Sequence, residues 1–532
     1  MNLRLLICLF ITFDLLAQSP STPPKLIVGI VIDQMRADYL TRYADRYCDG
    51  GFRRMQREGF EYSNMRYHYV PTYTGPGHAS IFTGCPPSVH GICGNNWFDR
   101  KENKTVYCTD DPAARGTGSL SAAGKMSPRH ELAPTLGDEL KLYYTQRSKV
   151  IGIALKDRAS ILPAGHNADA AYWYEKGSFI SSKWYLDTLP AWVIDFNEAK
   201  HADKACSSAW TTLFPVNTYK ASLSDNNPYE GTFIGETAPV FPHNIPELMQ
   251  ANGGLNIIRG IPAGNTLTRK FAEAAISGEQ LGADAITDLL AISFSSTDYV
   301  GHRYGIDAIE TEDTYLRLDR ELDTLFRFLD ARVGKDRYLV FLTADHAGQR
   351  TANYLRDQKI PGGIIDEKSF ADSLRSISKR LLGADYIAAW ENQQIYFTTG
   401  WRSQCSTEKI RAFMRELSEI DFVDRCIFAD DLYGGHAGMD YLAKLILAGA
   451  HPKRSGDVFV NFIHGYTEYQ PTGTTHGSPY PYDTHVPFLM MGSGIKNGRS
   501  LREVSIIDIA PTVSVLCGFP IPGAATGAVL QP

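Results

Sequence analysis

The sequence lacks a basic surplus and, after its N-terminal segment, any long apolar run. The formal net charge of the 532 residues is −6, so there is no cationic excess to displace the counterions of a nucleic acid. No later stretch approaches the ~20 apolar residues that a membrane-spanning helix needs. With 43% hydrophobic and 21% charged residues, the composition is that of a globular protein. We therefore expect neither a nucleic-acid nor a membrane partner.

Two further signatures are missing. The chain has nine cysteines but no CxxC pair, which argues against a thiolate metal site, so any metal should take oxygen and nitrogen ligands. There is also no Gly-x-Ser-x-Gly elbow, which argues against a Ser-His-Asp hydrolase. Without Cys8 the cysteines form an even set of eight, for which disulfides are expected in an oxidising compartment, although the pairing is not readable.

The N-terminus has the pattern of a secretory signal peptide. Arg4 precedes an apolar run from Leu5 to Phe13, and the small residue Ala17 follows shortly after. A short membrane anchor is the alternative, but the run is too brief to span a bilayer. We predict a signal peptide over residues 1–17, cleavage near Ala17, and export to the periplasm or the medium.

Three apolar runs each end in an acidic residue. Lys25–Asp33, Asp288–Asp298 and Arg337–His346 have the nearly continuous apolar character of strands buried on both faces of a parallel sheet. Carboxylates at the carboxyl ends of such strands face the crevice where open α/β sheets bind ligands. Asp33 taken alone is equally consistent with a helix N-cap.

Histidines follow two of these acids. Asp298 and His302 share a face if the segment between them is helical, and adjacent Asp345 and His346 can both point at one ion where the backbone turns. Further on, His476 and His485 flank a proline-rich turn, and either of them is a candidate ligand.

A hydroxyl and three nitrogen-bearing side chains complete the candidates. Thr74 precedes Gly-Pro-Gly at an expected helix start, where free N–H groups form an anion site; the alternative is a simple helix cap. Lys156 and Arg158 follow a strand-like run and would point the same way on an extended segment, or else form a solvated strand end. Asn95, in Gly-Asn-Asn-Trp, is also an ordinary turn residue.

Taken in order, these motifs resemble the alkaline phosphatase superfamily, and most closely its secreted PafA-type monoesterases with a threonine nucleophile. The motifs are strand-Asp33, Thr74, Asn95, Lys156-Asp-Arg158, Asp298-x-x-x-His302, Asp345-His346 and Asp483-Thr-His485. The resemblance runs from about residue 25 to the C-terminus. It implies an α/β fold with a central, mostly parallel sheet flanked by helices. We expect a single catalytic domain over residues 18–532, with insertions at about 167–280 and 352–470 that form a cap.

The resemblance also implies a two-zinc site that hydrolyses small-molecule phosphate monoesters through a phosphothreonine. One zinc would be held by Asp298, His302 and His485, and the other by Asp33, Asp345, His346 and the Thr74 oxygen, which leaves His476 in a supporting role. Asn95, Lys156 and Arg158 would hold the non-bridging phosphate oxygens. Because the charges of two zinc ions, three carboxylates and a threonine alkoxide cancel, Lys156 and Arg158 leave two positive charges, which match a monoester dianion.

Three alternatives fit the sequence less well. A phosphodiesterase or nucleotide pyrophosphatase of the same superfamily shares the ligands and the threonine, but typically has an apolar or nucleotide-binding pocket where this chain has Lys156 and Arg158. A sulfatase requires Cys-x-Pro-x-Arg, and Cys85-Pro-Pro-Ser-Val89 ends in the wrong residue. A secreted protein that keeps a metal only for structure would leave Lys156 and Arg158 without a role.

Overall fold

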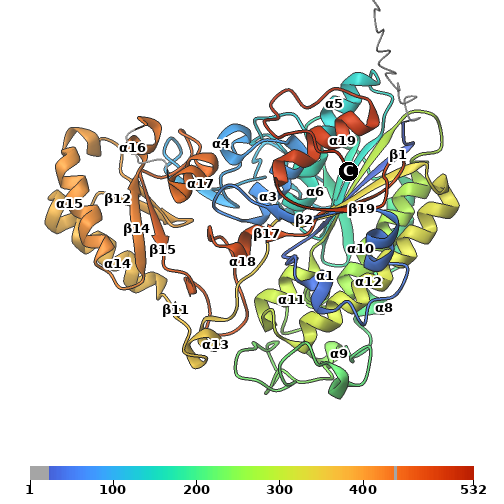
Figure 1. The fold of residues 1–532 in the computed structure, drawn as a ribbon, viewed down its shortest axis with the longest axis horizontal. Coiled ribbons are helices and arrows are strands. Elements are labelled where there is room, and N and C mark those ends of the chain that lie inside the picture. The colour runs from blue at the N-terminus through green and yellow to red at the C-terminus, as the bar shows by residue number, and fades with distance from the viewer. Residues whose placement is uncertain (1–22, 436–439) are drawn as a thin grey trace, which may run out of the picture.

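The structure, a computed structural model, describes residues 23–435 and 440–532 (Figure 1). The predicted signal peptide at residues 1–17 lies outside these ranges. Among the described residues, no helix is both long enough and apolar enough to cross a membrane.

A large mixed sheet forms the centre of the molecule. Its middle strands are parallel and lie in the order β10 (Tyr338–Thr343), β1 (Leu26–Ile32), β9 (Asp288–Phe294), β6 (Val150–Ala154) and β7 (Ala170–Glu175). In β1, β9, β10 and β6 every residue is buried, as the continuous apolar runs predict. The last residues of β1 and β9, Ile32 and Phe294, are direct neighbours. These strands therefore end together at one edge of the sheet.

Helices cover both faces of this sheet, which confirms the predicted α/β class (Figure 1). On one side lie α3 (Thr74–Thr83), α5 (Leu136–Tyr143) and α6 (Asp157–Ala164), and on the other α10 (Ala263–Gly278) and α12 (Ile309–Leu329). A row of small residues, Gly29, Ala291 and Gly152, crosses three neighbouring strands. A Cβ on Gly152 would lie 2.2 Å from the Ser160 carbonyl oxygen, so α6 packs this closely only because the residue is glycine.

Beyond the parallel strands the sheet continues through antiparallel pairs on both sides. On one side β10 is followed by β18 (Leu489–Gly492) and β2 (Phe60–Arg66), and on the other β7 is followed by β8 (Ser178–Ser182). Residues 170–182 thus belong to the central sheet, although they fall inside the insertion expected at about 167–280. They do so because Ala170–Trp173 pair with β6 in parallel register.

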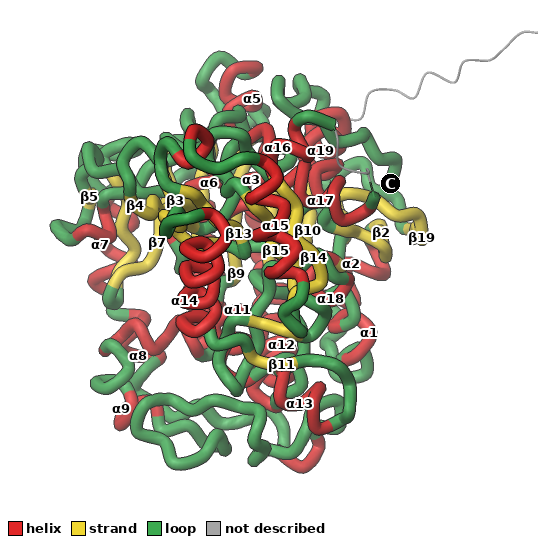
Figure 2. The backbone as a smooth tube through the Cα atoms, turned by 90° about the vertical axis from the view of Figure 1, so that its left-hand side faces the viewer, coloured by secondary structure: helices red, strands yellow, loops and turns green. Residues whose placement is uncertain are grey.

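Residues between β10 and β18 build a second lobe (Figures 1 and 2). Its antiparallel sheet has the order β12 (Ile387–Glu391), β13 (Gln394–Phe397), β15 (Val458–Phe462) and β14 (Val423–Phe428). Helices α14 (Glu367–Ile377) and α15 (Thr407–Ser418) bury Phe370, Leu374 and Phe413 in a core of the lobe's own. The division of the chain into one catalytic domain with two insertions stays a prediction.

The cysteines of the described chain are unpaired. Cys48, Cys85, Cys93, Cys108, Cys206, Cys405, Cys426 and Cys517 are all free. The expectation of disulfides is therefore not met in this structure, in which seven of these eight side chains are buried as small apolar groups.

Candidate active site

The ends of two neighbouring strands form the first group of candidate ligands. Asp33 follows β1, and Asp345 and His346 follow β10; all three side chains are fully buried. One ligand atom of each lies within 4.8 Å of the others. The three residues that the sequence assigned to one ion are thus brought together.

A second group lies beside it on α11 (Ser296–Tyr304) and on the loop that leads to residue 476. Asp298 and His302 are one turn apart on this helix, as their spacing predicts, with His302 Nε2 3.1 Å from Asp298 Oδ1. The third member of this group is His476. His302 Nδ1 lies 2.8 Å from the Thr474 carbonyl oxygen and His476 Nδ1 lies 2.7 Å from that of Thr72. An N–H donated to each carbonyl leaves Nε2 free to bind an ion.

His485 is not part of this second group. It is the first residue of β17 (His485–Val486), and its Nε2 lies 3.0 Å from the Ser63 carbonyl oxygen. The structure therefore places His476 where the sequence interpretation placed His485. Both histidines flank the same proline-rich turn, and sequence spacing alone does not tell which side of such a turn faces the site.

Buried atoms without partners make the first group a candidate cation site. Asp33 Oδ1, Asp345 Oδ2 and His346 Nε2 are buried and have no hydrogen-bond partner among the described residues, which is costly for polar atoms unless a ligand satisfies them. Burial raises the pKa of Asp33 to about 6 and, together with the neighbouring Asp33, raises that of Asp345 well above its usual range. Burial also lowers the pKa of His346 to about 3, which keeps this imidazole neutral. Carboxylates and neutral imidazoles are donors that suit a divalent metal such as zinc.

Thr74 is the first residue of α3 and is 1% exposed. The same helix start lies against the end of β10, because a Cβ on Gly77 would be only 2.3 Å from the Asp345 carbonyl oxygen. Gly77 thus permits the start of α3 to approach the first group. Gly75 N–H donates to Asn95 Oδ1 over 2.8 Å, which fixes the Asn95 amide at the same helix start.

Two cations complete the site. Lys156 Nζ donates to Asp33 Oδ2 over 2.7 Å and to Asp298 Oδ2 over 2.6 Å, and so it links the two groups. Burial opposes the charge of Lys156, but Asp298 and Asp33 together hold its pKa above the usual value. Arg158 Nη2 lies 3.5 Å from Thr74 Oγ1. An ammonium has three N–H donors, so Lys156 keeps one for a further acceptor.

Sequence reasoning missed Gln34 and Tyr107. The Gln34 N–H donates to Asp345 Oδ1 over 3.1 Å, and its Nε2 donates to Asp298 Oδ1 over 2.7 Å. Tyr107 accepts from Arg158 Nη1 over 3.0 Å. Gln34 adopts a left-handed φ of 65°, which is uncommon for a residue other than glycine. The only sequence signal for Gln34 is its place next to Asp33, and Tyr107 has none.

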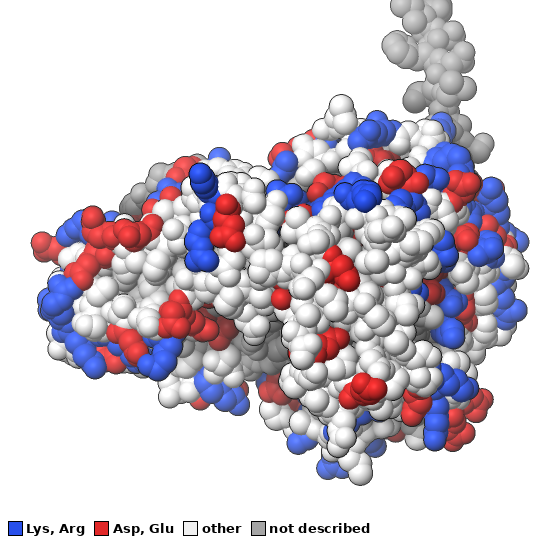
Figure 3. Space-filling model, turned by 90° about the horizontal axis from the view of Figure 1, so that it is seen from below, with Lys and Arg blue, Asp and Glu red and all other residues white. Residues whose placement is uncertain are grey.

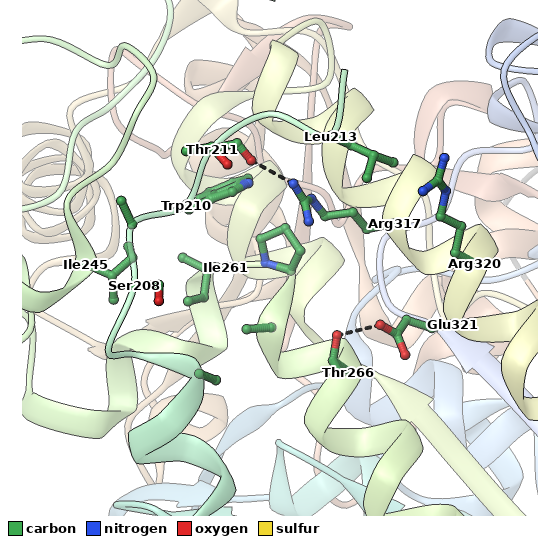
Figure 4. Close-up of a pocket in the computed structure, with 14 residues that line it drawn as sticks. Ser208, Trp210, Thr211, Leu213, Ile245, Ile261, Thr266, Arg317, Arg320 and Glu321 are labelled. Carbon is green, nitrogen blue, oxygen red and sulfur yellow. Dashed lines mark hydrogen bonds between the residues drawn. The ribbon is translucent and has the colours of Figure 1, made fainter. Parts of the chain in front are cut away.

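Two cavities differ in their relation to the site. One of about 610 Å³ is lined by His302 and its neighbours Tyr299 and Arg303, and so it reaches the second group. The other, of about 270 Å³, is lined by Trp210, Arg317 and twelve other residues, and none of the site residues is among them (Figure 4). Arg317 there is already paired with Asp313 over 2.6 Å and with the Thr211 carbonyl oxygen over 2.7 Å. The larger cavity is therefore the one placed to receive part of a substrate.

The charges on the surface are mixed. Figure 3 shows Lys and Arg interspersed with Asp and Glu on one face, with a hollow where the two lobes meet. This face has no broad basic patch of the kind that binds nucleic acid.

Comparison with known proteins gives consistent similarities. Residues 27–398 match the family of type I phosphodiesterases and nucleotide pyrophosphatases. The chain is 43% identical to the alkaline phosphatase PafA of Elizabethkingia meningoseptica, over 95% of this chain and 93% of that protein. It is 42% identical to the alkaline phosphatase PhoV of Synechococcus elongatus, over 95% and 92% of the two chains. The crystal structure of wild-type PafA superposes with a TM-score of 0.92 at 42% identity, covering 96% of this chain and 98% of PafA.

Proposed function

The chain belongs to the type I phosphodiesterase and nucleotide pyrophosphatase family as a PafA-type member of the alkaline phosphatase superfamily, and from this premise we propose how its residues hydrolyse phosphate monoesters. Its high identity to two alkaline phosphatases over nearly its full length supports monoester hydrolysis, and the phosphodiesterase alternative is not favoured. The mechanism, the metal and the roles of single residues are our proposals.

The two groups of ligands would each hold one zinc ion. Asp33, Asp345, His346 and the Thr74 oxygen form one set, and Asp298, His302 and His476 form the other, with His476 in place of His485. The buried, unpartnered atoms of Asp33, Asp345 and His346 support this assignment. Bound zinc would supply Lewis acidity, which lowers the pKa of a coordinated hydroxyl and stabilises charge on the attacking and leaving oxygens.

Thr74 is the nucleophile in this proposal. Its Oγ1 attacks phosphorus, the bond between phosphorus and the ester oxygen breaks, and the alcohol leaves with a proton. Water then attacks the phosphothreonine from the opposite side, the bond between phosphorus and Oγ1 breaks, and inorganic phosphate and free Thr74 result. The burial of Thr74 at the start of α3 supports this role, because it limits the approach of competing water.

Asn95, Lys156 and Arg158 would bind the non-bridging phosphate oxygens. Asn95 is held by the Gly75 N–H, Lys156 lies between Asp33 and Asp298, and Arg158 Nη2 is within 3.5 Å of the Thr74 oxygen. Once two divalent ions balance the carboxylates and the threonine alkoxide, the charges of Lys156 and Arg158 make the site positive overall. Such a site favours a monoester dianion over a diester monoanion.

The observation on which this proposal depends is the meeting of Thr74, Lys156 and Arg158 at the two ligand groups. The decisive experiment measures kcat/KM for 4-nitrophenyl phosphate and for its methyl diester, with zinc content determined on the same sample. We expect two zinc ions per chain and a preference for the monoester of several orders of magnitude. A preference for the diester would instead make the chain a phosphodiesterase.

We propose that the protein is exported. The predicted signal peptide with cleavage near Ala17 supports this location. Mass spectrometry of the protein recovered from the periplasm or the medium would test it, because a cleaved protein begins at about residue 18.

A further inference from the structure

The cavity of about 610 Å³ has three walls. Tyr299, His302 and Arg303 come from α11, and Tyr469, Gln470 and Thr472 come from the segment after β16 (Tyr466–Thr467). Glu230, Gly231 and Thr232 come from the loop before α9 (Ile245–Leu248). These segments are far apart in sequence. Hydrogen bonds join these segments. The Gly231 N–H donates to the Arg303 carbonyl over 2.8 Å, and the Tyr469 hydroxyl donates to the His302 carbonyl over 3.4 Å. The walls of the cavity are therefore held together by hydrogen bonds between segments of the fold.

The cavity begins at the part of the site from which the alcohol departs. In the proposed in-line reaction Thr74 and the first ligand group lie on the side of attack, so the alcohol leaves toward Asp298, His302 and His476. His302 belongs to both this group and the cavity wall. Tyr299, also on the wall, has its ring centroid 5.1 Å from Lys156 Nζ.

Arg303 is the cation of this cavity. Its guanidinium carbon lies 3.8 Å from the centre of the buried Phe233 ring, which holds the side chain in place. Within the described chain no carboxylate forms an ion pair with Arg303. Neighbouring arginines differ: Arg42 and Arg350 both pair with Asp307.

Glu230, the acidic residue of the cavity, does not cancel this charge. Burial and the nearby Glu310 raise the pKa of Glu230 to about 10, so its carboxyl is protonated at neutral pH. The wall next to His302 is consequently positive, with the aromatic rings of Tyr299 and Tyr469 beside it.

We propose that this cavity is the leaving-group subsite and that Arg303 makes it selective for alcohols that bear their own negative charge. The substrate class is phosphate monoesters of hydroxy acids, or of alcohols that bear a second phosphate. This inference depends on the proposed function, because it assumes that the alcohol leaves past His302. Arg303 is a specificity residue and takes no part in bond breaking.

Two aryl phosphates test the proposal. 4-Nitrophenyl phosphate and its 3-carboxy derivative share the reacting group and differ by one carboxylate on the leaving group. For each enzyme variant the ratio of the two kcat/KM values is measured at low ionic strength. We expect Arg303→Met to lower the relative rate on the carboxylated substrate by about tenfold, while the rate on the neutral substrate stays within about twofold.

Arg303→Lys and Arg350→Met are the matched variants. The lysine keeps the charge and should retain most of the preference, and the exposed Arg350, which pairs with Asp307, should not affect it. Calorimetric binding of benzylphosphonate and 4-carboxybenzylphosphonate gives a readout without turnover, and thermal unfolding shows whether Arg303→Met is folded. If Arg303→Met is unfolded, Arg303→Gln is used in the same comparison.

The outcomes separate the two proposals. A ratio that is unchanged in a folded Arg303→Met or Arg303→Gln enzyme, with equal binding of the two phosphonates, overturns the subsite while monoester hydrolysis stands. If the wild-type enzyme hydrolyses neither aryl phosphate, the proposed function itself fails. A selective loss on the carboxylated substrate, with retention by Arg303→Lys, supports the subsite.

Discussion

The imidazole rings of His346 and His476 stack with their centres 3.4 Å apart and 12° between their planes. Each ring belongs to a different ligand group, so the stack is the point at which the two groups touch. Burial lowers the pKa of His346 to about 3, and burial together with His346 holds that of His476 well below its usual range. Both rings are therefore neutral, as metal ligands must be.

Substitution of His476 should remove metal, and substitution of His485 should not. We expect His476→Ala to lose about one of two zinc ions per chain, because His476 faces Asp298 and His302. His485→Ala should keep both, because the His485 ring bonds the Ser63 carbonyl. Zinc content after dialysis, measured by mass spectrometry, shows which of the two histidines is a zinc ligand. Loss of zinc from His485→Ala alone would instead support His485 as the ligand, as the sequence motifs predict.

Thr74→Ala should lower kcat/KM for 4-nitrophenyl phosphate by roughly 10³-fold or more, because no hydroxyl remains to form the covalent intermediate. Thr74→Ser keeps a hydroxyl at the start of α3 and should remain active. Acid quench of the wild-type enzyme during turnover, followed by peptide mass spectrometry, should detect phosphate on Thr74. A fully active Thr74→Ala enzyme contradicts the proposed mechanism.

Asn392 of the second lobe should influence catalysis through Asn95. Asn392 and Gln393 form the two-residue turn between β12 and β13, both with positive φ (54° and 59°). Asn392 Nδ2 donates to the Asn96 carbonyl over 2.7 Å, and a Cβ on Gly94 would lie 2.4 Å from the same nitrogen. The turn thus supports the segment that positions Asn95.

We expect Asn392→Gly, which tolerates positive φ but lacks the donor, to lower kcat/KM by about tenfold through misplacement of Asn95. Gln393→Gly is the control, with the same backbone freedom and the Asn392 donor intact. In an Asn95→Ala background, Asn392→Gly should have little further effect. Additive losses would show that the turn acts by another route.

Stability should fall from pH 6.5 to 9 because of His243. Burial alone would lower the pKa of His243, but hydrogen bonds to Glu236 and Glu310 raise it to about 9. The folded state therefore keeps a proton that the unfolded state has lost, and the free energy of unfolding decreases by up to about 3 kcal/mol over this window. Below pH 6.5 the stabilisation is fully present.

His243→Gln should be less stable than the wild type at pH 6.5. Its free energy of unfolding should also fall less steeply with rising pH, by the equivalent of one bound proton. The exposed His464→Gln serves as the control and should keep the wild-type slope. Urea denaturation at several pH values measures both. Equal slopes in His243→Gln and the wild type would mean that His243 is not charged in the folded protein.

The sequence by itself determined the α/β class, because buried strands are local patterns, and its motifs carry the resemblance from which most of the proposed site follows. A buried strand is a continuous apolar run, and the residues just after its last position lie at the sheet edge, which is why Asp33 and Asp345 were predictable. Asp298 lies beyond the end of its strand, on α11. The i, i+4 spacing of Asp298 and His302 likewise fixes one helix face.

Only the tertiary structure decided the contacts that depend on loops and on chain pairing. The choice of His476 over His485 depends on how a proline-rich turn lies against Thr72, and the link from Gln34 to both ligand groups requires a left-handed backbone. The stacking of Arg303 on Phe233 and the hydrogen bond from Asn392 to the Asn96 carbonyl join segments that lie far apart in the sequence. Such contacts arise from packing between distant segments, and no periodicity in the chain encodes them.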